Sequence, residues 1–106
     1  MPVKWKEVAE KNLGRGDEIQ KTWFGKLDGK HGFLLLSNEK LLFVHEKGFL
    51  HKTYDLVLDL PYDKIGKITN DGKYKLELID IEGAKHKFSA ELPMSIIKES
   101  LEALKK

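Results

Sequence analysis

The chain has 106 residues, 34% of them charged, and its formal net charge at pH 7 is +2. This length is typical of a single domain with a hydrophobic core, and the near balance of charge argues against a nucleic-acid-binding surface. No cysteine is present, which excludes disulfides, thiolate zinc sites and cysteine nucleophiles.

The cellular location is predicted from what the sequence lacks. No stretch approaches the roughly 18 apolar residues of a transmembrane helix, and the N-terminus has no apolar block of the secretory type. All basic residues but Arg15 are lysines, whereas recognition of phosphates and bases favours the planar guanidinium of arginine. We therefore expect a cytoplasmic protein that does not bind nucleic acid.

The first expected element is a short amphipathic helix over residues 4–12. Trp5, Val8 and Ala9 have helical spacing, and the glycines of Gly14-Arg15-Gly16 stop the helix. The chain is then expected to form one domain over residues 1–106, with an N-terminal helix over 1–13, a β-barrel over 14–91 and a capping helix over 92–106.

Short strands separated by turns are expected after this helix. Ile19, Trp23 and Leu27 are evenly spaced, so we expect them on one face of the first strand, which the hairpin turn Asp28-Gly29 ends. Further on, Tyr54, Leu56, Leu58 and Leu60 alternate with Asp55, Val57 and Asp59, which predicts a half-buried strand that Pro61 interrupts. The seven expected strands cover residues 18–27, 32–37, 41–45, 54–60, 65–68, 74–81 and 86–90.

The period of the apolar residues changes at the C-terminus. Met94, Ile97, Leu101 and Leu104 form one apolar stripe on a helix, and Pro93 suits its first turn. Such a stripe needs an apolar surface, so we expect the helix to close one end of the barrel. Strands followed by a helix indicate an α+β, mainly β fold, in contrast to the strand–helix alternation of nucleotide-binding folds.

Three segments resemble the pleckstrin-homology (PH) superfamily in its GRAM and bacterial PH-like forms. Residues 32–44 resemble the family's hairpin, in which an apolar strand ends in Ser/Thr-Asn, here Ser37-Asn38; Glu39-Lys40 follows where the family often has Arg. Residues 60–68, with Leu60-Pro61-Tyr62 at their start, resemble the family's "ipy-x-x-I-x-x-I" edge, and residues 14–19 resemble its entry into the first strand. The resemblance covers residues 14–104 and implies a bent antiparallel barrel of about seven strands, capped by a C-terminal helix.

The resemblance also implies a function class. PH and GRAM modules often bind phosphoinositides or other lipids, and some bacterial PH-like domains assemble into rings, so a non-enzymatic binding or assembly module without a cofactor is implied. The family's lipid-binding motif places basic residues on the first hairpin, where this chain has Lys26, Lys30 and His31, followed by Gly32 and Phe33 where the motif has Arg. These three residues, aided by Lys73 or Lys75, form an alternative site for anionic lipid head groups on a membrane surface.

No residue pattern indicates catalysis or a metal site. The histidines lack the short spacing of metal ligands, the carboxylates fit the solvent side of strands, and no serine stands in a nucleophile elbow. We therefore expect no enzymatic activity, no metal and no cofactor. The residues considered are His31, His45, His51 and His86; Asp55, Asp59, Asp63, Glu77 and Asp80; and Ser37, Ser89, Ser95 and Ser100.

Phe49, Leu50 and Trp5 are the candidate partner-binding residues. Phe49 and Leu50 place apolar bulk in a turn, where they either cap the core or insert into a partner or a membrane. Trp5 either staples the N-terminal helix over the barrel or contributes to a partner surface, since Trp is enriched at binding hot spots. We expect association with a protein partner or a second copy, through this turn or through an exposed strand edge.

Overall fold

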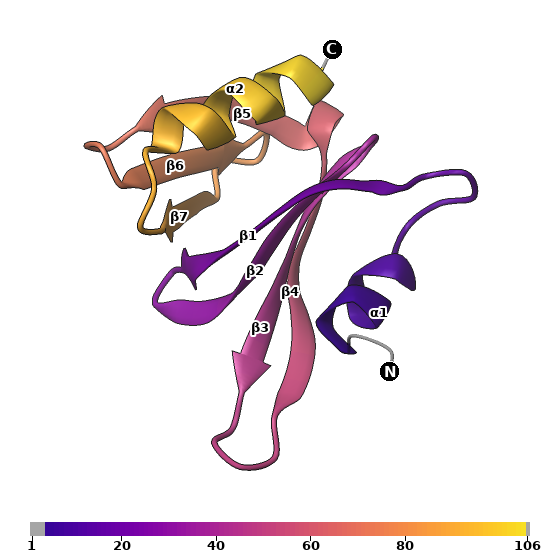
Figure 1. Ribbon diagram of the computed structural model, residues 1–106. Coiled ribbons are helices and arrows are strands. Elements are labelled where there is room, and N and C mark those ends of the chain that lie inside the picture. Colours follow the sequence, from indigo (N-terminus) through magenta and orange to yellow (C-terminus); the bar gives the residue numbers. More distant parts are fainter. Residues whose placement is uncertain (1–3, 106) are drawn as a thin grey trace.

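The computed structural model describes residues 4–105, which form one antiparallel sheet flanked by two helices (Figure 1). The strands of the sheet lie in the order β4-β3-β2-β1-β7-β6-β5. The predicted α+β class, the seven strands and both helices are confirmed, with most bounds within two residues of those expected. The elements are α1 (Lys4–Glu10), β1 (Ile19–Leu27), β2 (Lys30–Ser37), β3 (Lys40–Lys47), β4 (Thr53–Pro61), a 3-10 turn (Tyr62–Lys64), β5 (Ile65–Asn70), β6 (Lys75–Asp80), β7 (Lys85–Ser89) and α2 (Met94–Leu104).

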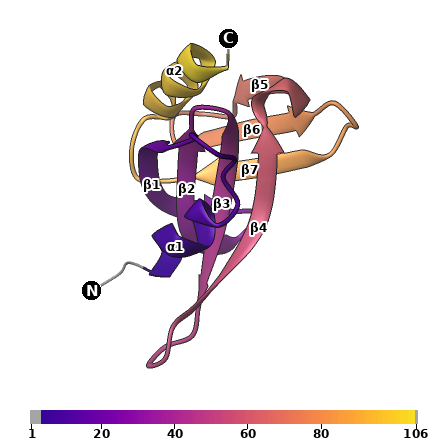
Figure 2. The same ribbon diagram turned by 90° about the vertical axis from the view of Figure 1, so that its right-hand side faces the viewer.

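The sheet bends strongly at β1, so that β5–β7 lie across one end of β1–β4 (Figures 1 and 2). β1 pairs with β2 over its whole length, but it pairs with β7 only at Lys26 and Leu27. Gly25 lies directly before this contact, and a Cβ atom there would come within 2.4 Å of the carbonyl oxygen of Ser89. The missing side chain therefore allows the two strands to approach at the bend.

The inner core lies inside this bend and is closed by α2. Met94, Ile97 and Leu101 of the predicted stripe are fully buried in it, so the capping role of the helix is confirmed. Phe43 and Phe88 meet edge to face at its centre, with ring centroids 6.2 Å apart. Trp23 packs against this core while remaining partly exposed, in agreement with its predicted place.

A second, outer cluster lies between α1 and the opposite face of β2 and β3. Its buried residues are Ala9, Leu35, Leu42 and Val44. The central strands β2 and β3 are therefore buried on both faces, which explains why they read as uninterrupted apolar runs in the sequence.

Two β-bulges change which face the residues of β1 and β4 occupy. On β4, Leu56 is opposite Val44 and Leu58 is opposite Phe43, so Val57 is an extra residue. Leu56 consequently joins the outer cluster, whereas Leu58 and Leu60 join the inner core. The sequence interpretation of one leucine face on this strand is therefore wrong.

The same error occurs on β1. Ile19 is opposite Ser37 and Lys21 is opposite Leu36, so the residue between them is extra. Because of this bulge, Ile19 packs in the outer cluster while Leu27 packs in the inner core. The prediction that Ile19 shares a face with Trp23 and Leu27 is wrong. Even spacing in the sequence gives no sign of a β-bulge between these residues.

Candidate functional site

The turn between β3 and β4, residues 48–52, forms the end of a hairpin that projects from the body of the molecule; we call it the hairpin tip (Figures 1 and 2). Its Phe49 and Leu50 are 88% and 83% exposed. The sequence left open whether these two side chains cap the core or insert into a partner or a membrane. Their exposure shows that they do not cap the core. Two large apolar side chains next to each other at a projecting end are typical of a contact surface.

The hairpin tip has a tight backbone turn. Gly48 has a φ of +95°, and a Cβ atom there would lie 2.3 Å from the carbonyl oxygen of His51. Only glycine adopts this conformation at low cost. Gly48 therefore lets the chain turn directly before Phe49 and Leu50.

Two ion pairs at the base of the hairpin tip balance the charges of the lysines and carboxylates there. Lys47 forms an ion pair with Asp55, and Lys52 Nζ lies 3.2 Å from Glu46 Oε1. The hydrogen bond from Lys47 is the main reason why the pKa of Asp55 is lowered. The hydroxyl of Tyr54 donates to Glu46 Oε2 over 3.2 Å, and its pKa is raised by desolvation and then by this carboxylate.

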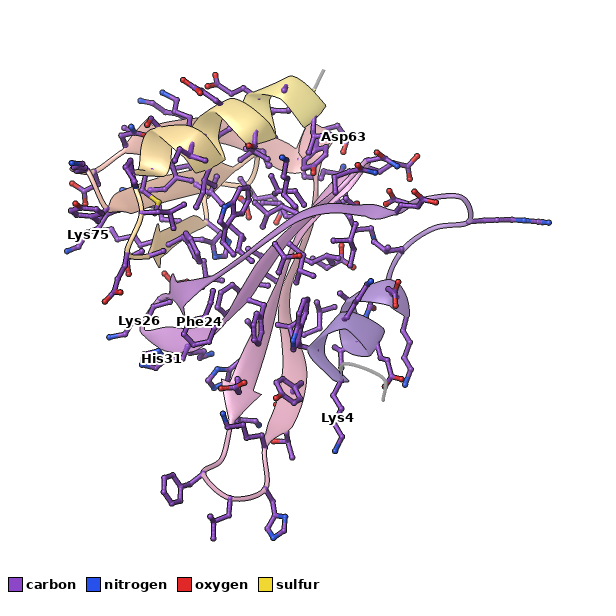
Figure 3. The ribbon with its side chains drawn as sticks, viewed as in Figure 1. Lys4, Phe24, Lys26, His31, Asp63 and Lys75 are labelled. Atoms are coloured by element: carbon purple, nitrogen blue, oxygen red, sulfur yellow. The ribbon has the colours of Figure 1, made fainter. Side chains whose placement is uncertain are left out.

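A pocket of about 430 Å³ lies where the first hairpin meets the end of β7; we call it the first-hairpin pocket. Phe24 and Tyr74, each about half exposed, give it aromatic walls. Figure 3 shows Phe24, Lys26 and His31 together on the first hairpin, with Lys75 facing them from the start of β6. The lining residues are Phe24, Gly25, Lys26, His31, Tyr74, Lys75, Ser89, Ala90 and Glu91.

The first-hairpin pocket brings together some of the basic residues proposed for lipid head groups. Lys26 and His31 are cross-strand partners on β1 and β2, and Lys75 joins them from β6. No carboxylate within residues 4–105 comes within ion-pair distance of Lys26 or Lys75. Lys30 sits opposite Leu27 at the end of the hairpin and does not line the pocket.

Sequence reasoning missed the aromatic part of this pocket. Phe24 lies two residues before Lys26, and therefore on the same side of β1, which is a signal that could have been used. Tyr74 comes from the turn before β6 and has no local signal, because only the folding of β6 and β7 onto β1 brings it there. Lys73 Nζ lies 5.5 Å from the Tyr74 ring centroid, a cation–π distance.

Trp5 lies on the opposite side of the sheet from the inner core. Its ring stacks on Phe33 with a centroid distance of 4.4 Å and an interplanar angle of 14°, and it packs against the outer cluster. This is the stapling arrangement. Trp5 is only half-buried, so its partner-binding role stays a prediction.

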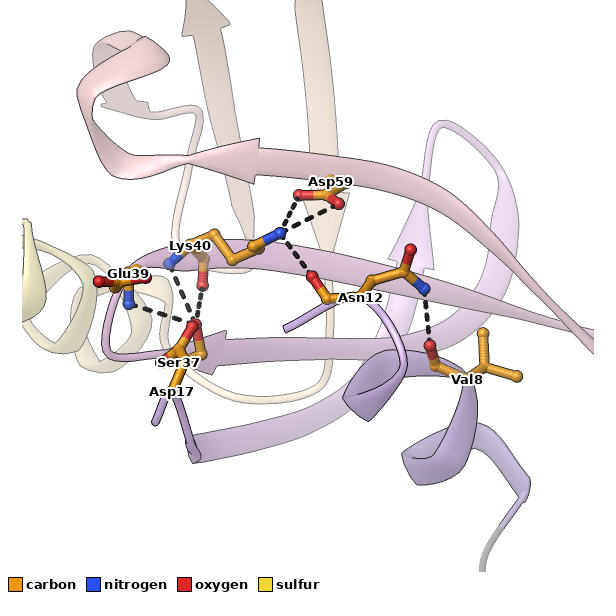
Figure 4. A network of polar contacts seen from close by, with 7 residues as sticks. All are labelled: Val8, Asn12, Asp17, Ser37, Glu39, Lys40 and Asp59. Carbon is orange, nitrogen blue, oxygen red and sulfur yellow. Dashed lines mark hydrogen bonds and ion pairs between the residues drawn. The ribbon is translucent and has the colours of Figure 1, made fainter. Parts of the chain in front are cut away.

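The three segments that resemble the PH superfamily meet at one buried point, which we call the Ser37 junction. Figure 4 shows the contacts of Ser37 with Asp17 and Lys40. The hydroxyl of Ser37 donates to Asp17 Oδ2 over 2.7 Å and accepts from the N–H of Lys40 over 3.0 Å. The hydroxyl of Tyr62 donates to the carbonyl oxygen of Ser37 over 2.5 Å. Burial, and secondarily the charge of Asp17, raises the pKa of Tyr62.

Lys40 extends the Ser37 junction toward α1 and β4. Its ammonium group donates to the carbonyl oxygen of Asn12 over 2.5 Å and lies 3.1 Å from Asp59 Oδ1 (Figure 4). These contacts give Asp59 a structural role, and they position the segment that follows α1. The Ser37 junction therefore organises the fold.

The other titratable groups weighed in the sequence are dispersed or paired. In the chain from residue 4 to 105, no three His, Asp or Glu side chains gather in a way that could hold a metal ion. His86 lies between Asp28 and Asp80, at 3.6 and 3.9 Å, and so links the turn of the first hairpin to β6. Neither of the two described helices is long and apolar enough to cross a membrane.

Comparison with known proteins identifies the fold. No protein-family model matches the sequence, and no curated protein matches it. Among solved structures, the chain is similar to a DUF1696 family protein with a pleckstrin-homology domain from Shewanella loihica PV-4. The TM-score is 0.62 at 12% identity, and the match covers 98% of this chain and 95% of that one. A likeness at this identity shows the fold alone.

Proposed function

We propose that this chain, which has a PH-like fold, is a non-enzymatic module that associates with further copies of itself through the hairpin tip. The observation that carries the proposal is the exposure of Phe49 and Leu50, 88% and 83%, at the apex of a projecting hairpin. Two such side chains held side by side in water lower the free energy when another surface covers them.

The size of this effect limits how tight the association is. Covering one large apolar side chain stabilises a complex by about 1.5–3 kcal/mol, whereas association costs about 4–15 kcal/mol in lost translational and rotational freedom. Phe49 and Leu50 alone therefore give weak binding. The surface that receives them has to add contacts of its own, and we expect assembly only at high protein concentration.

The charges around the hairpin tip favour a protein surface over a membrane. Lys47 and Lys52 are already paired with Asp55 and Glu46, so the tip offers no surplus of positive charge to an anionic bilayer. A single myristoyl chain gives only marginal membrane binding, and two side chains bury less apolar surface than that chain. Membrane insertion by this tip alone is thus the weaker explanation.

Light scattering during size-exclusion chromatography tests the proposal over a concentration series. We expect the molar mass to rise above 12.2 kDa with concentration, and the double variant Phe49→Ser, Leu50→Ser to remain monomeric. The matched control is Ile81→Ser, Ile96→Ser, which removes two other exposed apolar side chains, 58% and 47% exposed, and should associate like the unmodified protein. A protein that stays monomeric throughout, or a tip variant that still associates, contradicts the proposal.

A second candidate function is the binding of anionic lipid head groups in the first-hairpin pocket. It is favoured by the convergence of Lys26, His31 and Lys75 on one pocket, where neither lysine has a carboxylate partner in the described part of the chain. Each lysine near an anionic surface contributes about 1 kcal/mol, so the expected binding is weak and falls with salt.

Liposome sedimentation separates this candidate from the first. Vesicles that contain phosphatidylserine should sediment the protein at low salt, while vesicles of phosphatidylcholine alone should not. Lys26→Gln with Lys75→Gln should abolish the difference, whereas Lys64→Gln with Lys67→Gln, two exposed lysines on and before β5, should preserve it. Equal sedimentation with both vesicle types excludes the candidate.

A further inference from the structure

We infer that the surface that receives the hairpin tip is the first-hairpin pocket of a second copy, so that copies join head to tail. This inference rests on the proposed self-association and names the two surfaces that meet. One molecule carries the projecting, apolar hairpin tip and, elsewhere, a pocket with aromatic walls. Where such a pair occurs on one chain, the contact is heterologous and repeats from copy to copy.

The hairpin tip offers its two apolar side chains beyond the body of the molecule. Gly48, with a φ of +95°, lets the chain turn directly before them. Phe49 and Leu50 are 88% and 83% exposed. Both side chains are therefore available to enter a pocket of a partner.

The first-hairpin pocket matches the side chains of the hairpin tip in size and chemistry. Its volume of about 430 Å³ lies within the roughly 300–1,000 Å³ that is usual for ligand pockets, which is enough room for an aromatic side chain. Phe24 and Tyr74 stand half-exposed at its walls, and Gly25 and Ala90 add no bulk to it. Aromatic rings favour offset or edge-to-face contacts with one another, so Phe49 would find two such partners.

Charge does not oppose this contact. Lys26 and Lys75 stand at the pocket without a carboxylate partner among the described residues, and Glu91 lines the pocket as well. Beside the hairpin tip, Lys47 and Lys52 are paired with Asp55 and Glu46, so the pocket would meet groups whose charges balance. The choice of this pocket therefore rests on its volume and its aromatic walls.

The tip and the pocket belong to different parts of one molecule. The pocket is lined from β1, β2, the start of β6 and the end of β7, and no residue of the hairpin tip lines it. In Figure 3 the labelled pocket residues lie on the side of the body, while the β3–β4 hairpin extends past them. Each copy therefore presents one hairpin tip and one pocket, which allows the copies to form an open filament or a closed ring.

Mixing two complementary variants tests this arrangement by light scattering. The tip variant is Phe49→Ser, Leu50→Ser, and the pocket variant is Phe24→Ala, Tyr74→Ala; circular dichroism checks that both are folded. Each variant alone should stay at 12.2 kDa. An equimolar mixture should form a species of twice that mass and nothing larger, because the tip variant still offers a pocket and the pocket variant still offers a tip.

Other outcomes overturn the inference in ways that can be told apart. If the pocket variant associates like the unmodified protein while the tip variant does not, the tip docks elsewhere, and only the proposed self-association stands. If both variants are monomeric and their mixture is too, the contact is not head to tail. If the unmodified protein never associates, both proposals fail. Should the pocket variant not fold, Glu91→Trp replaces it by filling the pocket from an exposed lining position.

Discussion

The Ser37 junction and the hairpin tip lie at opposite ends of the β3 strand and differ in almost every physical respect. At the junction the Ser37 hydroxyl is fully buried and has hydrogen-bond partners on three sides. At the tip, Phe49 and Leu50 are apolar and almost fully exposed. The polar groups of the junction find their hydrogen-bond partners within the chain, whereas the tip leaves apolar surface in contact with water.

This difference shows where a resemblance to a fold family carries information. The segments that resemble the PH superfamily contribute Asp17, Ser37 and Tyr62, and all three meet at the Ser37 junction. They hold the bent sheet together and say little about a ligand. The candidate contact surfaces lie at the hairpin tip and the first-hairpin pocket, where the chain has only a partial match to a family motif.

The strongest test of the contrast is Ser37→Ala. It removes the partner of Asp17 Oδ2 and of the N–H groups of Glu39 and Lys40, so we expect a loss of about 1–3 kcal/mol in the free energy of unfolding. Urea denaturation measures this loss, and association of the folded fraction should be unchanged. An unchanged unfolding midpoint would show that the junction does not stabilise the fold.

Tyr62→Phe should have a smaller effect, with a distinctive pH dependence. Loss of the hydrogen bond to Ser37 costs about 1 kcal/mol at neutral pH. Since burial raises the pKa of Tyr62 in the folded state, the neutral tyrosine stabilises the fold below the ordinary pKa of about 10, and this stabilisation is lost as pH rises above it. The two proteins should therefore converge in melting temperature above about pH 10; a constant difference contradicts the assignment.

Asp55→Asn, behind the hairpin tip, should have a still smaller effect with the opposite pH dependence. The pair with Lys47 lowers the pKa of Asp55, so its stabilisation is present above the ordinary pKa of about 4 and is lost as pH falls below it. The pair is exposed, and such pairs contribute little. Melting curves at pH 7 and pH 3 should differ from the unmodified protein only at pH 7.

The smallest effect on stability is expected for Phe49→Ser, Leu50→Ser. Exposed side chains make few contacts, and surface substitutions usually change the free energy of unfolding by less than about 0.5 kcal/mol. Urea denaturation at a concentration where the protein is monomeric checks this. A large loss of stability would mean that the hairpin tip contributes to the fold, and would remove the contrast with the Ser37 junction.

The elements of the fold were predictable because their signals are local. The turn at Asp28-Gly29 has positive φ at both residues, 51° and 84°, as the residue pair indicates. The apolar stripe that starts at Met94 likewise leads directly to the inner core. Patterns of this kind depend on neighbours within a few residues, and tertiary contacts did not override them.

The candidate surfaces were predictable only in part. The position of Phe49 in a turn is local, but its exposure is not, because an apolar turn can also fold back on the core. The first-hairpin pocket depends on contacts between Phe24 and residues of β6 and β7, far along the chain. Lys26 and His31 were predicted as neighbours from their hairpin, while the contributions of Tyr74 and Glu91 required the bend of the sheet.

The bulge at Val57 implies that a shorter β4 could keep the same two hydrophobic layers. Val57 is 38% exposed, so many side chains fit at this position. Leu56 and Leu58 already face Val44 and Phe43, which are adjacent on β3. A strand without Val57 would therefore alternate regularly and keep Leu56 in the outer cluster and Leu58 in the inner core. Removal of a regularly paired residue such as Asp59, by contrast, would turn the side chain of Leu60 to the other face.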